Sequence, residues 1–134
     1  MSRIEKIIDK SQWNRREHFE HFSAFDDPFF GITVNIDCAN TYMQAKEKGM
    51  PFSLLILHRI ITAACKVEEF RYRISGDELV CYDSLVPDAT VARADHTFSL
   101  APFEYDATEN VFIQNAQAEI ERGQVTSGLT QMSP

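Results

Sequence analysis

The stretch that decides the fold runs from residue 51 to residue 83 and reads PFSLLILHRIITAACKVEEFRYRISGDELVCYD. Its first half, residues 53–67, is apolar on several sides and follows Pro51, a residue type well tolerated in the first turn of a helix. Its second half alternates apolar and polar residues on both sides of Gly76-Asp77, which suits a two-residue hairpin turn. The stretch therefore predicts a deeply packed helix followed by a β-hairpin over residues 71–83.

Upstream of this stretch, residues 13–22 predict a short helix. Ser11 precedes the segment and is a residue type that caps helices. Arg15 and Phe22 lie seven positions apart, so they share one face of that helix. Residues 25–30, with three phenylalanines around Asp-Asp-Pro, predict an irregular loop.

Residues 31–37 predict a half-buried β-strand, because Ile32, Val34 and Ile36 alternate with polar residues. The next segment, residues 40–48, predicts a helix that ends at Gly49.

Downstream, residues 90–92 predict another short strand. Asp106 with Glu109 three positions later resembles a capping box and predicts the start of a further helix that ends at Gly123. Its buried face would carry Phe112, Ala116 and Ile120.

The order of these elements predicts an α/β fold in two layers, a mixed β-sheet with helices packed on it. Residues 124–134 are polar and add no closing element. Because a sheet that stops there would leave exposed edges, we expect more chain to follow and the fold to be incomplete.

Composition narrows the function classes. The chain has 134 residues, 44% hydrophobic and 25% charged, as an ordinary globular domain has. Its net charge of -7 predicts no nucleic-acid partner and no anionic membrane, since both require clustered Lys and Arg. Three cysteines without a C-x-x-C pair indicate a reducing compartment, so we expect a cytoplasmic protein.

The residues alone suggest little chemistry. No glycine-rich nucleotide motif and no G-x-S-x-G is present, and the pair His18 and His21 lacks further ligands, so we expect no metal. Asp26 and Asp27 fit a turn better than an acid–base pair, and His58 fits a core histidine better than a base. Five phenylalanines between residues 19 and 30 leave two interpretations open, a hydrophobic core or an apolar wall for a ligand.

Three blocks of sequence resemble the chloramphenicol acetyltransferase family. Residues 13–19, WNRREHF, match its opening signature W-x-R-[RK]-E-H-F. Residues 70–87 contain FR, DELV and DSL-x-P, which resemble the family's F/L-R, D/G-E-L-V/I and D-S-V-x-P at similar spacing. Residues 90–91 and 97–99, TV and TFS, resemble its T-V-F and T-F-S elements.

The resemblance implies that residues 1–134 are the N-terminal part of a single acetyltransferase domain. It implies an acetyl-CoA-dependent O-acetyltransferase, without a metal, that assembles as a homotrimer with active sites between subunits. The substrate would be chloramphenicol or a similar small hydroxyl compound. A histidine would act as general base, and a serine hydroxyl would hold the oxyanion.

The family's histidine lies in an H-H-x-x-x-D-G motif that these residues do not contain. We therefore expect no catalytic residue in this chain and expect the histidine downstream of it. The resemblance assigns Arg15 to supporting that histidine through the motif's aspartate. It assigns Phe22, Phe30 and Phe98 to the substrate wall, and Thr90 to a possible polar contact with the substrate.

Two departures from the family pattern bear on specificity. Asp26-Asp27-Pro28 makes the expected pocket mouth more acidic, and Ala92 replaces the phenylalanine of T-V-F. Two alternatives to chloramphenicol acetylation stay open. One is an acetyltransferase of the same scaffold with a different hydroxyl acceptor, and the other is a truncated relative without catalysis.

Overall fold

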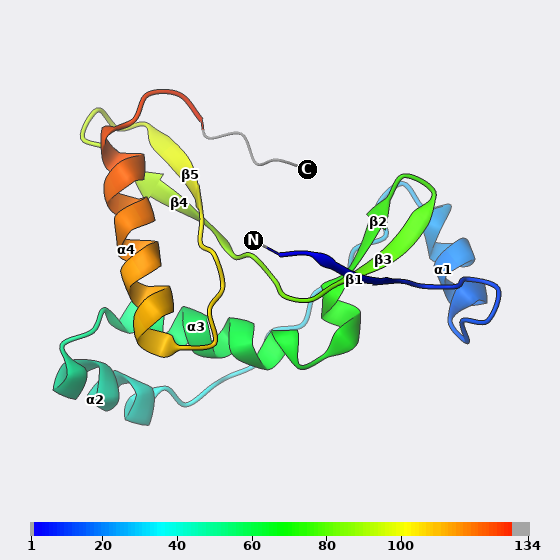
Figure 1. The fold of residues 1–134 in the computed structure, drawn as a ribbon, viewed down its shortest axis with the longest axis horizontal. Coiled ribbons are helices and arrows are strands. Elements are labelled where there is room, and N and C mark those ends of the chain that lie inside the picture. The colour runs from blue at the N-terminus through cyan, green and yellow to red at the C-terminus, as the bar shows by residue number, and fades with distance from the viewer. Residues whose placement is uncertain (1, 130–134) are drawn as a thin grey trace.

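Two groups of elements lie at opposite ends of the molecule in the computed structural model, which describes residues 2–129 (Figure 1). The helix α3 (Phe52–Cys65) belongs to one group and extends toward the other. We call one group the core lobe, made of α2 (Ala39–Lys48), α3, α4 (Glu109–Val125) and the strands β4 and β5. The other group is the hairpin lobe, made of α1, the short 3-10 helix η1, and the strands β1, β2 and β3.

The core lobe holds the main hydrophobic core. β4 (Asp88–Ala92) and β5 (Phe98–Pro102) form a two-stranded antiparallel sheet, and α4 packs across one face of it. The aromatic rings of Phe103 and Phe112 are fully buried and meet edge-on with centroids 6.4 Å apart. The rest of this core consists of Ala45, Leu54, Leu55, Val91, Ala101, Ile113 and Ala116.

The helix α4 approaches its sheet closely at Gly123. A Cβ atom at this position would lie 2.5 Å from the Ser99 hydroxyl oxygen and 3.4 Å from Val91 Cβ. The buried Ser99 hydroxyl donates a hydrogen bond of 3.0 Å to the Gly123 carbonyl. Only glycine leaves room for this contact, so the residue is part of the helix–sheet interface and does not end the helix.

The hairpin lobe is built on a tight turn. β2 (Tyr72–Ser75) and β3 (Glu78–Tyr82) pair antiparallel, and Gly76 has φ +58°, the left-handed region that its turn requires. β1 (Ile4–Ile7) adds to the other side of β3, which gives the order β1-β3-β2. The central strand β3 is therefore paired on both edges and has three consecutive buried residues.

The helix α1 (Arg16–Ser23) is held on the hairpin lobe by Trp13. The Trp13 ring meets Phe19 of α1 at 5.9 Å and Tyr72 of β2 at 6.0 Å, both edge-on. Ser11 does not cap α1, because its amide and hydroxyl both donate to the Asp9 carboxylate in the preceding turn. The predicted cap was therefore wrong, and the helix begins three residues later than expected.

Several predictions of structure are confirmed. The helix after residue 40 ends at Gly49 with φ +64°, the helix after Pro51 is present, and the hairpin over residues 71–83 has its turn at Gly76-Asp77. The predicted α/β combination of helices and β-sheet is also present. The strands form two antiparallel sheets among residues 2–129, so the parallel pairing that a mixed sheet would add does not occur in this part of the chain.

The predicted strand over residues 31–37 is absent, because no described strand lies beside it to complete its hydrogen bonds. β1 and β5 were not predicted. The last helix starts at Glu109 and not at Asp106, whose carboxylate instead accepts the Thr108 amide. Of the polar tail expected over residues 124–134, residues 130–134 lie outside the described residues.

Candidate functional site

The first candidate wall is the aromatic end of α1. The rings of His21, Phe22 and Phe25 meet pairwise at centroid distances of 5.2, 5.1 and 5.4 Å. Both phenylalanines are still half-exposed. The three rings support one another and leave an apolar face open, as the wall of a pocket for an aromatic ligand would.

Phe30, assigned to the same wall, does not join this cluster. It lies in the extended chain after α1 and is 88% exposed. The structure therefore places Phe22 in a small aromatic cluster and leaves Phe30 without a packing surface among the described residues.

Arg15 directly precedes α1 and points to the hairpin lobe. Its guanidinium lies 2.8 Å from the Glu69 carboxylate of η1 (Glu68–Arg71), and both side chains are roughly half-exposed. Within this chain Arg15 thus pairs with Glu69, a partner that the sequence did not suggest.

The second candidate wall is the face of β4 and β5 that points away from α4. Val91 and Ser99 are buried on the α4 side, so Thr90 and Phe98 share the opposite face. Thr90 lies across from Leu100 in the register, and Phe98 lies across from Ala92. The structure therefore brings Thr90 and Phe98 together, and the small Ala92 leaves the Phe98 ring half-exposed.

A shallow groove of about 410 Å³ runs beside Thr90, between β4, α3 and α4. Its lining is largely apolar and includes Leu54, Leu57, Phe103 and Ile120. Thr90 is thus a polar group at the margin of an apolar surface, an arrangement that orients a ligand by one hydrogen bond. Sequence analysis missed the α3 residues of this groove, because on an apolar helix a groove residue has the same pattern as a core residue.

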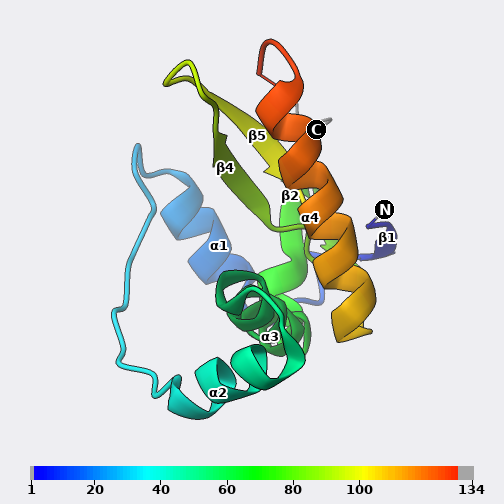
Figure 2. The same cartoon turned by 90° about the vertical axis from the view of Figure 1, so that its left-hand side faces the viewer.

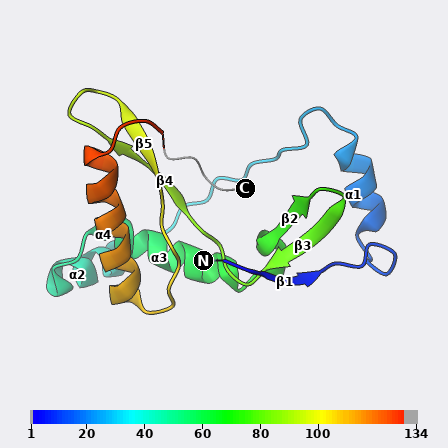
Figure 3. The ribbon, with the colours of Figure 1, turned by 45° about the horizontal axis from the view of Figure 1, so that its top comes forward.

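The two walls lie far apart in one chain. α1 is at one end of the molecule and the β4–β5 pair is at the other, in the views of both Figure 1 and Figure 3. Phe22 and Phe98 therefore cannot enclose the same small molecule within a single copy of residues 2–129.

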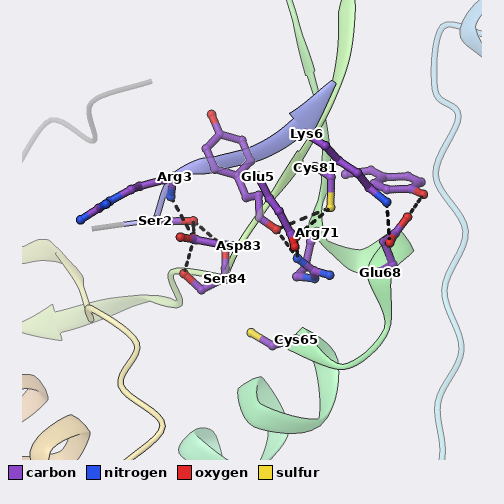
Figure 4. Close-up of polar contacts among 12 residues, drawn as sticks. Ser2, Arg3, Glu5, Lys6, Cys65, Glu68, Arg71, Cys81, Asp83 and Ser84 are labelled. Carbon is purple, nitrogen blue, oxygen red and sulfur yellow. Dashed lines mark hydrogen bonds and ion pairs between the residues drawn. The ribbon is translucent and has the colours of Figure 1, made fainter. Parts of the chain in front are cut away.

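A cluster of charged groups joins β1 to the rest of the hairpin lobe (Figure 4). Lys6 reaches Glu68 at 2.8 Å, and Glu68 also accepts the hydroxyl of Tyr72 at 2.5 Å. Arg71 pairs with Glu5 and donates to the Tyr82 carbonyl. Two carboxylates and two cations balance one another here, so the cluster holds strands together and leaves no net charge for a ligand.

Titration in this cluster follows from those contacts. The hydrogen bond from Tyr72 to Glu68, together with burial, raises the pKa of Tyr72 to about 12. The hydrogen bonds from Lys6 and Tyr72 hold the pKa of Glu68 below its ordinary value. Burial raises the pKa of the Cys81 thiol, which keeps it protonated and makes it a poor nucleophile.

The histidines of the described residues offer no assembled base. His58 is buried against Tyr105 and Phe112, and its Nε2 lies 3.0 Å from the Asp106 carbonyl oxygen, which agrees with its interpretation as a core residue. Among residues 2–129 no group of three or more metal-binding side chains comes together. No helix in that range is long and apolar enough to cross a membrane.

Comparisons with known proteins agree with these features. The family model described as chloramphenicol acetyltransferase matches residues 5–133. A chloramphenicol acetyltransferase from Clostridium perfringens is 33% identical over 117 residues, which are 86% of this chain and 55% of that protein. Chloramphenicol acetyltransferase 3 from Escherichia coli is 30% identical over 116 residues, 86% of this chain and 54% of that protein.

A solved structure of a chloramphenicol acetyltransferase superimposes with a TM-score of 0.82 at 30% identity, covering 96% of this chain and 59% of that chain. The chain is thus an α/β protein with the fold of that solved structure over the residues they share. This chain belongs to the chloramphenicol acetyltransferase family. It spans about half the length of the curated relatives that it matches.

Proposed function

We propose that this chain is the N-terminal half of an acetyl-CoA-dependent O-acetyltransferase that acts on chloramphenicol or a similar hydroxyl compound. The observation that carries the proposal is the pair of half-exposed aromatic walls, on α1 and on the β4–β5 face, in a member of this family. Walls of this kind suit a small, largely apolar substrate with few polar anchors.

In this proposal Phe22 and Phe30 line one side of the acceptor site, and Phe98 lines the other. The Thr90 hydroxyl forms a hydrogen bond with the acceptor. Because the two walls lie at opposite ends of one chain, each site would combine α1 of one copy with β4–β5 of another. That separation supports sites shared between subunits, and the family resemblance proposes that the assembly is a homotrimer.

The proposed reaction needs a base that residues 1–134 do not contribute. The acceptor hydroxyl oxygen attacks the thioester carbonyl, and a histidine from outside residues 1–134 accepts its proton. The carbon–sulfur bond then breaks, and coenzyme A leaves as the thiol with that proton. Arg15 would act as a positioning residue for the histidine, and the groups of this chain would bind and orient the acceptor.

The setting of the reaction is also part of the proposal. Residues 1–134 would form the N-terminal part of a single acetyltransferase domain in the cytoplasm. Cys38, Cys65 and Cys81 are all free thiols, which agrees with a reducing compartment.

A second acceptor class is favoured by the loop after α1. Asp26 and Asp27 are exposed and directly follow Phe25, so negative charge lies beside the first aromatic wall. A hydroxyl compound that carries positive charge would bind better there than neutral chloramphenicol does. This alternative keeps the acetyl transfer and changes only the acceptor.

The test starts from the polypeptide that the native reading frame encodes around residues 1–134. Its intact mass is compared with 15.3 kDa, the mass of these residues. Release of the coenzyme A thiol is then followed with acetyl-CoA and either chloramphenicol or cationic hydroxyl compounds. We expect a larger mass and acceptor-dependent release of thiol.

Phe98→Ala tests the proposed wall, with Phe70→Ala as the control because Phe70 is similarly exposed but lies on η1. Losing one aromatic contact should lower kcat/KM by roughly tenfold or more for Phe98→Ala and leave Phe70→Ala unchanged. A mass of 15.3 kDa, or no thiol release with any acceptor, overturns the proposal.

A further inference from the structure

The helix α1 is held in place without burial of its own side chains. None of its residues is buried, and residues 27–38 follow it as chain without helix or strand. Figure 2 shows this stretch bowing outward between α1 and α2. The position of α1 therefore depends on the contacts made near its start, where Trp13 and Arg15 lie.

Two adjacent arginines at this start form different kinds of ion pair. Arg16 pairs with Glu20 one turn further along α1 at 3.0 Å, so this pair stays within the helix. Arg15 instead reaches across to η1, where its Nη2 lies 2.8 Å from Oε1 of Glu69. Of these two pairs, only the second links the start of α1 to another element, so it can fix where the Arg15 side chain lies.

Glu69 lies on a short helix that is itself tied to its surroundings (Figure 4). Its neighbour Glu68 accepts hydrogen bonds from Lys6 of β1 at 2.8 Å and from the Tyr72 hydroxyl of β2 at 2.5 Å. Arg71, the last residue of η1, donates to a backbone carbonyl of β3. Because η1 is tied to all three strands of the hairpin lobe, a carboxylate on it offers a firm support for a flexible cation.

The contact with Glu69 leaves part of the Arg15 guanidinium accessible. A guanidinium carries several N–H donors, and the strongest carboxylate pairs use two of its nitrogens at once. Here a single nitrogen lies within ion-pair distance of Glu69, and the Arg15 side chain is still 53% exposed. The other donors can therefore reach a second carboxylate while Glu69 keeps its place.

We infer that Glu69 is a positioning residue that acts through Arg15. A free arginine side chain samples many rotamers, and this freedom must be lost before the guanidinium can orient another group. Glu69 removes part of that freedom in advance, so the accessible donors already point in one direction. The inference rests on the proposed function, in which Arg15 supports the catalytic histidine.

The opposite role for Glu69 is the alternative that an experiment has to separate. In that role Glu69 would compete for Arg15 and withdraw it from the histidine, so its removal would speed the reaction. The single contact and the exposure of the remaining guanidinium favour positioning, because both groups can hold Arg15 at the same time.

The first measurement compares Glu69→Gln with Glu20→Gln in the polypeptide that the native reading frame encodes around residues 1–134. Each substitution removes the carboxylate partner of one of the two adjacent arginines. Release of the coenzyme A thiol gives kcat and KM for the acceptor. We expect Glu69→Gln to lower kcat by roughly threefold to tenfold with KM unchanged, because Arg15 acts on the base and not on the acceptor. Glu20→Gln should leave both constants unchanged.

The second measurement needs no activity and uses the 134-residue chain. Nuclear magnetic resonance of the Arg15 guanidinium gives its rate of rotation about the Nε–Cζ bond. An exposed ion pair shifts an equilibrium by a factor of up to about five, so Glu69→Gln should speed this rotation by roughly twofold to fivefold. In Glu20→Gln the rotation of Arg15 should keep its original rate.

The outcomes distinguish this inference from the proposed function. Unchanged rotation in Glu69→Gln overturns the inference whatever the activity. Faster rotation with kcat unchanged or raised in an active polypeptide also overturns it, and a raised kcat would assign Glu69 the competing role. Both of these results leave the proposed acetyl transfer intact. If the unchanged polypeptide releases no thiol, the proposed function fails and the inference fails with it.

Discussion

The hairpin over residues 72–82 and the unpaired segment over residues 29–37 have the same alternating pattern and opposite structures. The hairpin finds its partner across the Gly76-Asp77 turn, so β2 and β3 complete each other's hydrogen bonds. The unpaired segment lies between a helix and a helix, and no described strand is within reach of it. Alternation therefore encodes which face of a strand is apolar, and whether the strand forms depends on where its partner lies in the chain.

The largest expected effect is the difference in stability between alanine substitutions in these two regions, because one side chain is buried and the other is exposed. Leu79→Ala in β3 removes a side chain that is 4% exposed, whereas Ile32→Ala removes one that is 79% exposed. We expect Leu79→Ala to lower the free energy of unfolding by about 2–5 kcal/mol. Ile32→Ala should change it by less than about 0.5 kcal/mol. Urea denaturation of the chain measures both changes in the free energy of unfolding. Similar changes for the two variants would show that the two regions do not differ in packing.

The turn provides the next test. Gly76 has φ +58°, so a β-branched residue is strained there, whereas Gly31 in the unpaired segment has no atom near its absent Cβ. Gly76→Val should cost about 1–2 kcal/mol of stability. Gly31→Val should cost almost nothing in the chain alone. A larger loss from Gly31→Val would show that the segment is packed.

Alkaline pH should weaken the paired region through Tyr72. Because the pKa of Tyr72 is raised from 10.0 to about 12, the unfolded chain loses this proton first as the pH rises. The stabilisation is fully present below about pH 10 and is lost as the pH approaches about 12. Thermal unfolding across this range should show a fall in stability that Tyr72→Phe reduces and that Tyr42→Phe, on α2, leaves intact. If stability falls with rising pH as steeply in Tyr72→Phe as in the unchanged chain, the contact with Glu68 is not the cause of the fall.

The smallest effect concerns Arg15. Its ion pair with Glu69 joins two side chains that are 53% and 42% exposed, so Arg15→Ala should cost no more than about 1 kcal/mol in the chain alone. In an active full-length enzyme the same substitution should lower kcat much more than it alters stability. Equal losses of stability and activity would reduce Arg15 to a structural role.

The sequence predicted those parts of the fold whose signals are local. The helix end at Gly49, the turn at Gly76 and the apolar face of α4 all depend on neighbours within a few residues. β1 was missed because Ile4, Ile7 and their charged neighbours show no clean alternation and are all exposed. Its pairing with β3, more than seventy residues away, is a tertiary contact that no local pattern reports.

The candidate site was predictable in the same uneven way. The family motifs pointed to Thr90 and Phe98 separately, but their position on one face depends on the pairing of β4 with β5, a strand that was not predicted. The distance between α1 and the β4–β5 face did not follow, because it depends on how α3 separates the two lobes. The ion pair between Arg15 and Glu69 could not be predicted either, since Glu69 is on a 3-10 helix that the sequence did not predict.

The close contact between Gly123 and Ser99 has a consequence for how this family varies. The hydroxyl oxygen would lie 2.5 Å from any Cβ at position 123, so a side chain there requires the Ser99 hydroxyl to rotate away, a smaller residue at position 99, or a helix displaced from its sheet. Each of these changes breaks the hydrogen bond from Ser99 to the Gly123 carbonyl. We therefore expect substitutions at these two positions, 24 residues apart in the chain, to be coupled among relatives.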